Sequence, residues 1–415
     1  MRTIDLLIIG GGSAGMAAAI QAKKEGVDDI LIVEKDDHLG GILNQCIHNG
    51  FGLTEFKEEL TGPEYLSRFV QQVEELKIPY LLNSMVIDMT KDKIVTISIK
   101  GKGVEILKAR SIIMATGCYE RGAGAIQIPG DRCAGIITAG TAQKYLNIHG
   151  YLCGKRIVIL GSGDIGLIMA RRLTLEGAKV ICVSEIMPYS NGLNRNIAQC
   201  LNDYDIPLYL SRSVSKVIGK DRLEKVVLSA VDDKMQFIPG TEMEIECDTL
   251  ILSVGLIPYI SLLDYIDCPT SSTKGAVVNE HMETKIEGIF SCGNCLHVHD
   301  VVDFVTDEGR LAGHGAAQYL KGLAPKGEEI KVLPKDGISY VVPQTINSLN
   351  NEDVTFKFRV RKPVKDVYLI IENNGQQIAK IMKPVLIPSE MVMVKLSKDK
   401  LSNLKGDVTL RLEGR

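Results

Sequence analysis

The sequence contains neither a long apolar run nor an excess of one charge. We find no stretch of about eighteen apolar residues, so we expect no membrane-spanning helix. The 48 Lys and Arg residues nearly balance the 51 Asp and Glu residues, and the charges are interspersed. This balance excludes the basic surface typical of nucleic-acid-binding proteins. The first strand pattern follows Met1 almost at once, so we also expect no leader peptide.

Cysteine occurs ten times but without the spacing of a disulfide framework. With no secretion signal expected, we interpret the cysteines as reduced thiols of a cytoplasmic protein. Cys292 and Cys295 form the sole Cys-x-x-Cys pair, and a four-cysteine metal or iron–sulfur site lacks its second pair. The sequence therefore predicts no metal site.

What the sequence does contain is one glycine pattern twice, Gly10–Gly15 and Gly161–Gly166. Each copy follows an apolar strand, opens a helical stretch, and has an acid nineteen residues after its third glycine, namely Glu34 and Glu185. Corresponding positions differ by 151, since 161 − 10 and 185 − 34 give the same value. This context is that of a dinucleotide-binding fingerprint.

Each position of the fingerprint has a physical role. The first glycine permits a tight turn, the second lets the backbone approach a diphosphate, and the third lets the helix pack closely on the strand. The helix N-terminus offers unpaired N–H groups to the phosphates. We expect the first copy to bind its dinucleotide through Gly10, Gly12, Ser13, Ala14, Gly15, Glu34 and Lys35. We expect the second to use Gly161, Gly163, Asp164, Ile165, Gly166, Glu185 and Gly255.

The acid after each fingerprint bears on the choice of cofactor. A glutamate accepts hydrogen bonds from ribose hydroxyls but repels a 2′-phosphate, by roughly 4 kcal/mol at about 4 Å and an effective dielectric near 20. No arginine follows Glu185 directly. We therefore expect NAD(H), rather than NADP(H), at the second site.

The patterns predict an α/β protein with two Rossmann-like, three-layer dinucleotide-binding domains and a small C-terminal all-β module. We expect a first domain at 1–118 and 256–325, an inserted domain at 119–255, a linker at 326–337 and the module at 338–415. In the module the apolar period becomes two, and Asn374-Gly375 between two strand-like runs predicts a hairpin.

These features resemble the two-dinucleotide flavoprotein superfamily that includes thioredoxin reductase and glutathione reductase. The resemblance covers about residues 1–320 and includes Ala115-Thr116-Gly117, Ser253-Val254-Gly255 and Gly288–Asn294. It implies FAD at the first fingerprint and NAD(H) at the second, with Gly41, Thr116, Gly117, Gly293 and Asn294 also holding FAD. The family usually has Asp where this chain has Asn294, and an amide oxygen can still accept a ribityl hydrogen bond.

A closer resemblance is carried by Gly40–Leu53 and Cys292–Phe304. These segments are similar to the FAD/NAD oxidoreductase that accompanies an FAD-dependent glycerol-3-phosphate dehydrogenase, and to opine oxidase and cyanide synthase alpha subunits. The resemblance implies a subunit that passes electrons between NAD and a partner dehydrogenase. We expect the β module to dock that partner, and a homo-oligomer is compatible with the sequence.

Three side chains are candidate catalytic groups: Cys46, His48 and His297. Cys46 follows Gly40-Gly41 without the second cysteine of a disulfide reductase, so a dithiol mechanism is unsupported. On an extended backbone Cys46 and His48 would share a face, and an imidazolium would favour the thiolate. The alternative is that Cys46 only packs beside the flavin. His297 or His299 could donate a proton or bond flavin O2, although a solvated or capping histidine is the default.

Three functions remain open from the sequence. The first is an FAD-dependent oxidoreductase that transfers electrons between NAD(H) and a second acceptor or partner dehydrogenase. The second is a stand-alone NADH oxidase or peroxidase that uses Cys46. The third is a nucleotide-binding assembly subunit whose flavin is structural or absent.

Overall fold

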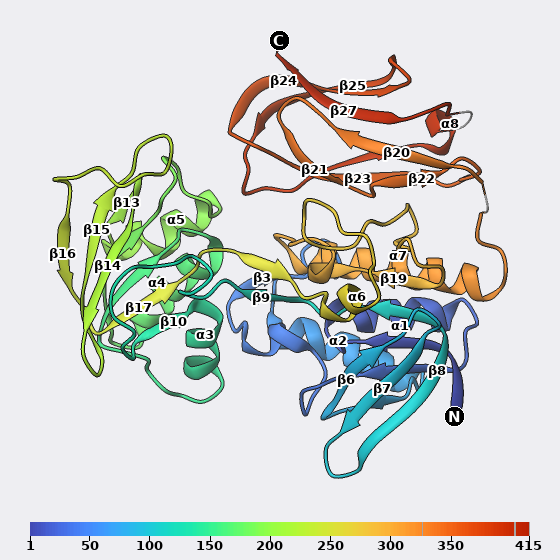
Figure 1. Cartoon of the computed structure of the whole chain (residues 1–415), viewed down its shortest axis with the longest axis horizontal. Coiled ribbons are helices and arrows are strands. Elements are labelled where there is room, and N and C mark those ends of the chain that lie inside the picture. The colour runs from blue at the N-terminus through green and yellow to red at the C-terminus, as the bar shows by residue number, and fades with distance from the viewer. Residues whose placement is uncertain (326, 402–403, 415) are drawn as a thin grey trace. The chain divides into compact units, whose positions relative to one another are not determined.

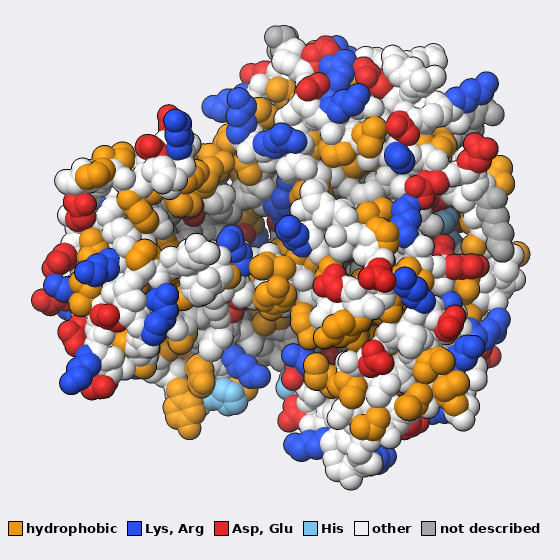
Figure 2. All heavy atoms as spheres, viewed as in Figure 1, with side chains coloured by type: hydrophobic (Ala, Val, Ile, Leu, Met, Phe, Trp, Pro, Cys, Tyr) orange, Lys and Arg blue, Asp and Glu red, His pale blue; other side chains and the backbone are white. Residues whose placement is uncertain are grey.

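The computed structural model describes residues 1–325, 327–401 and 404–414. Lys326 of the expected linker and residues 402, 403 and 415 of the expected module lie outside the described residues. The chain divides into two compact units, Met1–Cys118 with Pro258–Arg415, and Tyr119–Ile257 (Figure 1). None of the described helices combines the length and apolar character that a membrane span requires. Acidic and basic side chains are interspersed over the face seen in Figure 2.

The first unit is built around a sheet in the order β5-β2-β1-β8-β7-β6, with β19 paired to β8. Strands β5, β2, β1, β8 and β19 are parallel to their neighbours, whereas β7 and β6 extend the sheet antiparallel. Strands β2 and β19 are buried throughout, as expected for a sheet covered on both faces. The bounds are β1 (Arg2–Ile9), β2 (Ile30–Val33), β5 (Tyr80–Leu81), β6 (Ser84–Met89), β7 (Ile94–Ile99), β8 (Gly103–Met114) and β19 (Ile289–Ser291).

Two helices of this unit, α1 (Ser13–Lys24) and α7 (Val302–Leu320), pack in close contact. Gly309 and Gly313 on α7 permit this approach, because a Cβ at either would lie 2.3 Å from a carbonyl oxygen of α1. A third helix, α2 (Gly62–Glu75), begins at Gly62-Pro63 with a capping box between Thr61 and Glu64. The remaining short elements of this unit are η1 (Gly41–Gln45), β3 (Asn49–Phe51), β4 (Leu60–Thr61), α6 (Ser261–Tyr265) and η3 (Gly293–Cys295). The paired strands β9 (Cys118–Glu120) and β18 (Leu256–Pro258) span the two boundaries between the units in the chain.

The second unit repeats the plan with a parallel sheet in the order β10-β17-β11-β12-β13. An antiparallel sheet, β14-β15-β16, is inserted in the chain between β13 and β17 of the parallel sheet. The strand bounds are β10 (Ile136–Thr138), β11 (Arg156–Leu160), β12 (Lys179–Ser184), β13 (Leu208–Tyr209), β14 (Arg212–Gly219), β15 (Leu223–Ala230), β16 (Met243–Glu246) and β17 (Thr249–Leu252). The helices are α3 (Ala139–Asn147), α4 (Asp164–Leu175), α5 (Asn194–Cys200) and η2 (Asn202–Tyr204).

The C-terminal strands form two sheets, in the orders β22-β20-β27-β24-β25 and β21-β23-β26. A single hydrophobic cluster contains Val332 and Leu369 from the first sheet and Phe356 and Phe358 from the second. The Asn374-Gly375 turn joins β24 to β25, confirming the expected hairpin. The bounds are β20 (Glu329–Pro334), β21 (Ile338–Val342), β22 (Thr345–Asn347), β23 (Val354–Val360), β24 (Val364–Asn373), β25 (Gln376–Leu386), β26 (Val392–Leu396), α8 (Lys398–Leu401) and β27 (Val408–Gly414).

The described part of the expected linker is not a plain connection. It contains β20, which pairs with β22 and with β27. Ile330 and Val332 are buried while Glu329 and Lys331 are exposed, which is the period of a half-buried strand. The surrounding Gly, Pro and Lys residues are typical of a linker, so this short alternation did not lead to a predicted strand. The predicted class, α/β with two Rossmann-like domains and C-terminal antiparallel sheets, is confirmed.

Candidate functional site

The first glycine turn joins β1 to α1 and leaves the helix end open. Gly10 has φ of +107°, and a Cβ there would lie 2.4 Å from the Ala115 carbonyl oxygen. Gly15 also has no room for a side chain, because a Cβ there would lie 1.9 Å from the Gly10 carbonyl oxygen. Gly12 is the N-cap of α1 and offers no side-chain cap, and a Cβ added to it would meet nothing within 4 Å. The uncapped amides, in a first turn without an acid, fit a dinucleotide diphosphate.

Glu34 ends β2 and is tied to this turn. It is 4% exposed, and its Oε2 accepts a hydrogen bond from the Gly11 amide at 2.7 Å. Its Oε1 accepts one from the Asp36 amide at 2.9 Å. Since each carboxylate oxygen has two lone pairs, capacity remains for ribose hydroxyls. The other expected contacts lie close by in the chain: Ser13 and Ala14 are in the first turn of α1, Lys35 is exposed after β2, and Gly41 opens η1.

The second glycine turn has the same geometry between β11 and α4. Gly161 has φ of +98°, and a Cβ there would lie 2.0 Å from the Ser253 carbonyl oxygen. Glu185 is 3% exposed and accepts hydrogen bonds from the Ser162 amide at 2.9 Å and the Met187 amide at 3.0 Å. The backbone amides that donate to the two glutamates are also separated by the repeat distance, because 162 − 11 and 187 − 36 are both 151. The duplication therefore includes the bonds that hold each glutamate.

The two turns differ at the first helical residue. Where α1 begins with Ser13, α4 begins with Asp164, whose Oδ1 accepts bonds from the Leu193 amide at 2.8 Å and Asn196 Nδ2 at 2.6 Å. An acid at this position opposes a phosphate at the helix end. The remaining expected residues lie around the same turn: Gly163 is the N-cap of α4, Ile165 and Gly166 are in its first turn, and Gly255 follows β17 with φ of +105°.

The Gly293-Asn294 motif lies between β19 and α7. A Cβ at Gly293 would lie 2.9 Å from the Ala14 Cβ, so this glycine brings the motif against the start of α1. The Asn294 Oδ1 accepts a bond from the His299 amide at 3.1 Å and lies 3.3 Å from His299 Nδ1. Donation from Nδ1 to this oxygen requires the tautomer of His299 that carries its proton on Nδ1. The ribityl hydrogen bond expected at Asn294 stays a prediction.

Thr116 and Gly117 end the central strand at the same sheet edge. The Thr116 hydroxyl donates to the Tyr259 carbonyl oxygen at 2.6 Å, and Gly117 has φ of +71°. The positive φ turns the chain away at the carboxyl end of β8. This is the edge of a parallel sheet where ligands of α/β folds bind.

A buried cluster lies directly behind Gly293, centred on Glu308 of α7. The Glu308 carboxylate accepts bonds from the Gly293 amide at 2.8 Å, His297 Nε2 at 2.9 Å and Lys357 Nζ at 2.7 Å. His299 Nε2 lies 3.3 Å from it without the alignment of a hydrogen bond. Burial alone would raise the pKa of Glu308, but the ammonium and imidazoles together hold it well below the usual range.

The histidines of this cluster are not solvated or capping residues, so that default is wrong. His297 is 1% exposed, and the His299 side chain is fully buried. Burial lowers the pKa of His299 to about 4, and the nearby Glu308 carboxylate offsets this shift only in part. Nδ1 of His297 and Nε2 of His299 have no hydrogen-bond partner among the described residues. Such orphaned buried nitrogens are uncommon and are typical of functional sites.

Sequence reasoning missed Glu308, Lys357 and a second pair, Asp300 with Arg359. Lys357 and Arg359 are on β23 of the C-terminal module, yet they bond α7 and the loop before it. Arg359 Nη2 also donates to the Val298 carbonyl oxygen at 3.2 Å. No local pattern could reveal these pairs, because their members are 49 and 59 residues apart in different elements.

The three candidate redox cysteines, Cys46, Cys292 and Cys295, lie in environments that disfavour thiolate. Cys46 caps the C-terminal end of η1 rather than lying on an extended strand, so the same-face argument with His48 does not hold. Its Sγ donates to the Ile42 carbonyl oxygen at 3.4 Å, and burial raises the pKa of the thiol to about 12. The His48 Nδ1 instead lies 3.0 Å from the Asn49 carbonyl oxygen. Burial likewise raises the pKa of both Cys292 and Cys295, and each is fully buried.

Comparison with known proteins agrees with this geometry. Residues 4–356 match the pyridine nucleotide-disulphide oxidoreductase family. An NADH oxidase of Methanocaldococcus jannaschii is 28% identical over 354 residues, covering 79% of this chain and 71% of that protein. A thioredoxin reductase of Treponema pallidum is 24% identical over 324 residues, covering 77% of this chain and 98% of that protein. The crystal structure of T. acidophilum thioredoxin reductase shares the fold, with a TM-score of 0.64, 22% identity, and coverage of 78% of this chain and all (100%) of that one.

The matched segment contains both glycine turns, both buried glutamates and the Gly293-Asn294 motif. It spans most of the first unit and the whole of the second. The chain therefore belongs to the pyridine nucleotide-disulphide oxidoreductase family and is an FAD-dependent NAD(P)H oxidoreductase.

Proposed function

We propose that this chain transfers electrons between NAD(H) and a partner dehydrogenase through bound FAD, without a thiol relay. The observation that carries the proposal is the state of the three candidate cysteines. Thiolate, not thiol, is the nucleophile in disulfide chemistry. Burial raises the pKa of Cys46, Cys292 and Cys295, so at neutral pH all three are neutral thiols.

The inserted unit supports the same conclusion. Among the described residues all ten cysteines are free thiols, and Tyr119–Ile257 contains no Cys-x-x-Cys pair. The relatives named thioredoxin reductase carry a name that implies a disulfide substrate. The resemblance to thioredoxin reductase implies such a pair in the NAD(P)-binding unit, and because this unit lacks one, we infer a different electron acceptor for this chain.

The chain's own residues would hold the two cofactors in distinct ways. The Gly10–Gly15 turn, Glu34 and Asn294 would bind FAD, and the Gly161–Gly166 turn with Glu185 would bind NAD(H). Bound FAD would supply the chemistry, exchanging a hydride with nicotinamide and electrons with the second partner. Glu185 favours NAD(H) over NADP(H), because three hydrogen bonds from Ser162 and Met187 keep its charge beside the ribose position.

The proposed partner is a dehydrogenase resembling the FAD-dependent glycerol-3-phosphate enzyme. Support comes from the resemblance of Gly40–Leu53 and Cys292–Phe304 to the subunit that accompanies such enzymes. The thioredoxin reductase fold covers 78% of this chain and the family match ends at residue 356, so most of the C-terminal module is additional. We assign partner docking to this module. The partner's substrate would bind on the partner, because no segment here resembles a site for it.

A second candidate is a stand-alone NADH oxidase. It is favoured by the Methanocaldococcus jannaschii relative, which bears that name. In this version oxygen would replace the partner as electron acceptor, again without a Cys46 thiolate. Steady oxygen consumption by the isolated chain separates the two functions.

The test is anaerobic titration of the purified yellow protein with NADH and, separately, NADPH. We expect flavin absorbance to bleach with NADH at lower concentration than with NADPH, with no long-wavelength thiolate–flavin band. Reoxidation should then be fast with the partner dehydrogenase and slow with oxygen or disulfides. Rapid reduction of thioredoxin or another disulfide would contradict the proposal, and so would a flavin that NADH does not reduce even with the partner present.

A further inference from the structure

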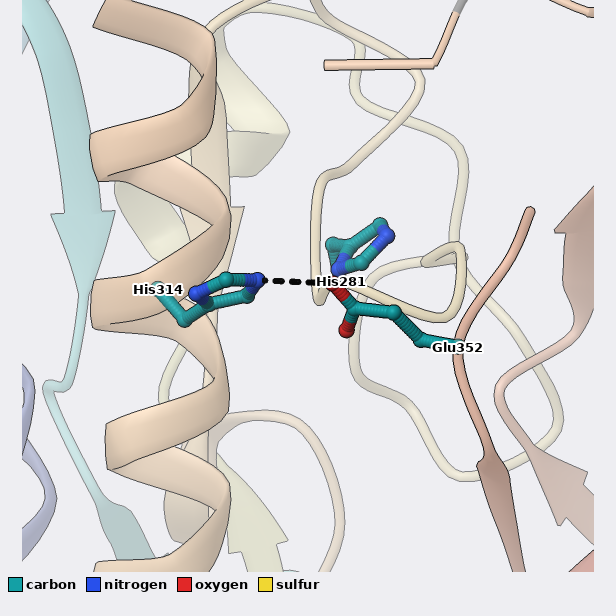
Figure 3. Close-up of side chains that lie close together, drawn as sticks. All are labelled: His281, His314 and Glu352. Atoms are coloured by element: carbon teal, nitrogen blue, oxygen red, sulfur yellow. Dashed lines mark hydrogen bonds and ion pairs between the residues drawn. The ribbon is translucent and has the colours of Figure 1, made fainter. Parts of the chain in front are cut away.

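We propose that His281, His314 and Glu352 form a binding site for a divalent transition-metal ion, best suited to Zn²⁺. One ligand atom from each residue lies within 4.8 Å of the others. Figure 3 shows the two imidazoles and the carboxylate converging, His314 from α7, His281 from the loop before β19 and Glu352 from the segment before β23. Two imidazoles and one carboxylate are a ligand set of zinc sites that keep a fourth position for water.

Glu25 gives the site an outer shell. The Glu25 Oε1 accepts a bond from His314 Nδ1 at 2.8 Å, which leaves His314 Nε2 facing Glu352 Oε1 at 3.3 Å. A carboxylate that bonds the far nitrogen of a histidine fixes its tautomer and makes it a better metal ligand. Glu25 is itself held by Gln21 Nε2 at 2.7 Å. The imidazole of His314 is therefore oriented before any ion binds.

His281 supplies an independent indication of a missing partner. Its side chain is buried, with 8% of the residue exposed, and its Nδ1 has no hydrogen-bond partner among the described residues. This unpartnered nitrogen is available to coordinate an ion. Its backbone lies directly on α7 because residue 315 is glycine, where a Cβ would lie 2.4 Å from the His281 carbonyl oxygen.

A second cluster of two histidines and one glutamate differs from the His281–His314–Glu352 site in already containing a cation. His297, His299 and Glu308 also lie within reach of one ion. There, however, the Lys357 ammonium already bonds the carboxylate at 2.7 Å and would repel a metal ion. In the part of the chain that the structure describes, the ion-pair partner of Glu352 is His314. A cation can therefore take the central position at His281, His314 and Glu352 without displacing a lysine.

The distances define what binding requires. Ligands about 2 Å from a tetrahedral Zn²⁺ lie roughly 3.3 Å apart. His314 Nε2 and Glu352 Oε1 already match this separation at 3.3 Å, and the His281 ligand atom lies within 4.8 Å of both, so it has to approach them by at most about 1.5 Å (4.8 − 3.3). Glu352 is exposed, which gives the ion an entry path and a place for water. Imidazole nitrogens favour Zn²⁺ over the oxygen-seeking Mg²⁺ and Ca²⁺.

A bound ion would join α7 to the C-terminal module beside the segment that leads into β23. Binding should therefore stabilise the first unit, because the ion contacts the folded form at three separate segments. This consequence is independent of the electron acceptor and of the NAD(H) preference.

The experiment uses the full-length, tag-free flavoprotein after chelator treatment and dialysis. Zn²⁺ is titrated calorimetrically and thermal midpoints are recorded with Zn²⁺ and with Mg²⁺. The variants are His281→Ala, His314→Ala, Glu352→Ala and Glu25→Ala. His149→Ala is the matched control, because His149 is exposed and belongs to the second unit. An unchanged flavin spectrum establishes that each variant is folded, and Glu352→Ala, at an exposed position, serves if a histidine variant does not fold.

We expect one Zn²⁺ per chain and a higher thermal midpoint with Zn²⁺ but not with Mg²⁺, in wild type and in His149→Ala alike. Each ligand variant should lose at least about 100-fold in Zn²⁺ affinity, and Glu25→Ala about 10- to 100-fold. The proposal is overturned if wild type binds no stoichiometric Zn²⁺, which would leave only a Glu25–His314–Glu352 ion triad. It is also overturned if the ligand variants bind Zn²⁺ as wild type does, which would place the ion on the thiols.

Discussion

Replacing Lys357 by Met should destabilise the first unit by about 3–5 kcal/mol, the usual cost of removing one partner of a buried ion pair. Lys357 Nζ lies 2.7 Å from Glu308 Oε2, and both side chains are buried. At that distance and an effective dielectric of about 20, the gross attraction is about 6 kcal/mol. The substitution keeps the apolar stem but leaves the carboxylate with its amide and imidazole donors alone.

The assay is urea unfolding of the flavin-loaded protein, followed by circular dichroism and by flavin release. A chain with two compact units need not unfold in one step, so the flavin signal reports the first unit specifically. Lys331→Met is the matched control, because Lys331 is exposed on β20 of the C-terminal sheets and should change stability by no more than about 0.5 kcal/mol. Flavin retention should fall with Lys357→Met, since the Gly293 amide bonds the same carboxylate.

The pH dependence provides a second check with a definite sign. Without the ammonium, burial raises the folded-state pKa of Glu308 above its unfolded value. The stability lost through the unpaired buried carboxylate is then lost in full above that raised pKa. It is regained as pH falls, because protonation removes the buried charge. The deficit of Lys357→Met relative to wild type should therefore shrink in acid. A deficit below about 1 kcal/mol at neutral pH, or one that grows in acid, would refute the electrostatic reasoning.

Further predictions concern the glycine turn, the thiol and the buried imidazole. Gly10→Ala should abolish flavin retention, because the added Cβ would lie 2.4 Å from the Ala115 carbonyl oxygen at a residue whose φ is +107°. Gly26→Ala should retain the flavin, because φ is +84° there and the added Cβ would have no atom within 4 Å. Equal flavin content in the two variants would contradict this prediction. Cys46→Ser should reduce flavin with NADH within about twofold of the wild-type rate in stopped flow, and a tenfold loss would restore a role for the thiol. His299 has a folded-state pKa of about 4, against an unfolded-state value near 6.5. As pH falls from about 6.5 to 4, the unfolded state binds the proton first, so the protein should lose roughly 3 kcal/mol of stability through this residue. Urea midpoints across that range should fall less steeply for His299→Asn, and an equal slope would contradict the assignment.

Sequence patterns predicted the features that depend on local chemistry. Both glycine turns follow from short-range sterics, because the positive φ at Gly10 and Gly161 excludes other residues. The Asn374-Gly375 hairpin is predictable for the same reason, with φ of +48° and +79° at its two residues. The pattern failed at β20, where four residues of alternation are too few to outweigh the Pro, Gly and Lys around them.

Side chains that meet across the fold could not be predicted. Glu308 is one of several polar residues along α7, and only its burial distinguishes it from an exposed neighbour such as Asp307. Lys357 is on β23, where it alternates in sequence with the buried apolar residues Phe356 and Phe358. The structure buries Lys357 with its ammonium hydrogen-bonded to the Glu308 carboxylate of α7 at 2.7 Å. The metal prediction was likewise confined to cysteine spacing, and the His281–His314–Glu352 group has no sequence spacing to recognise.

These cross-element contacts change how the C-terminal module must be tested. Deletion of residues 338–415 is the direct test of whether the module docks a partner. It would also remove Lys357 from Glu308 and Arg359 from Asp300, and so uncover a carboxylate that bonds the Gly293 amide. Loss of complex assembly in such a deletion would then report a damaged flavin site as readily as a lost docking surface. Charge reversals at exposed positions within 338–415, such as Lys362 and Lys365, leave the buried pairs intact, so assembly lost with a retained flavin would identify docking.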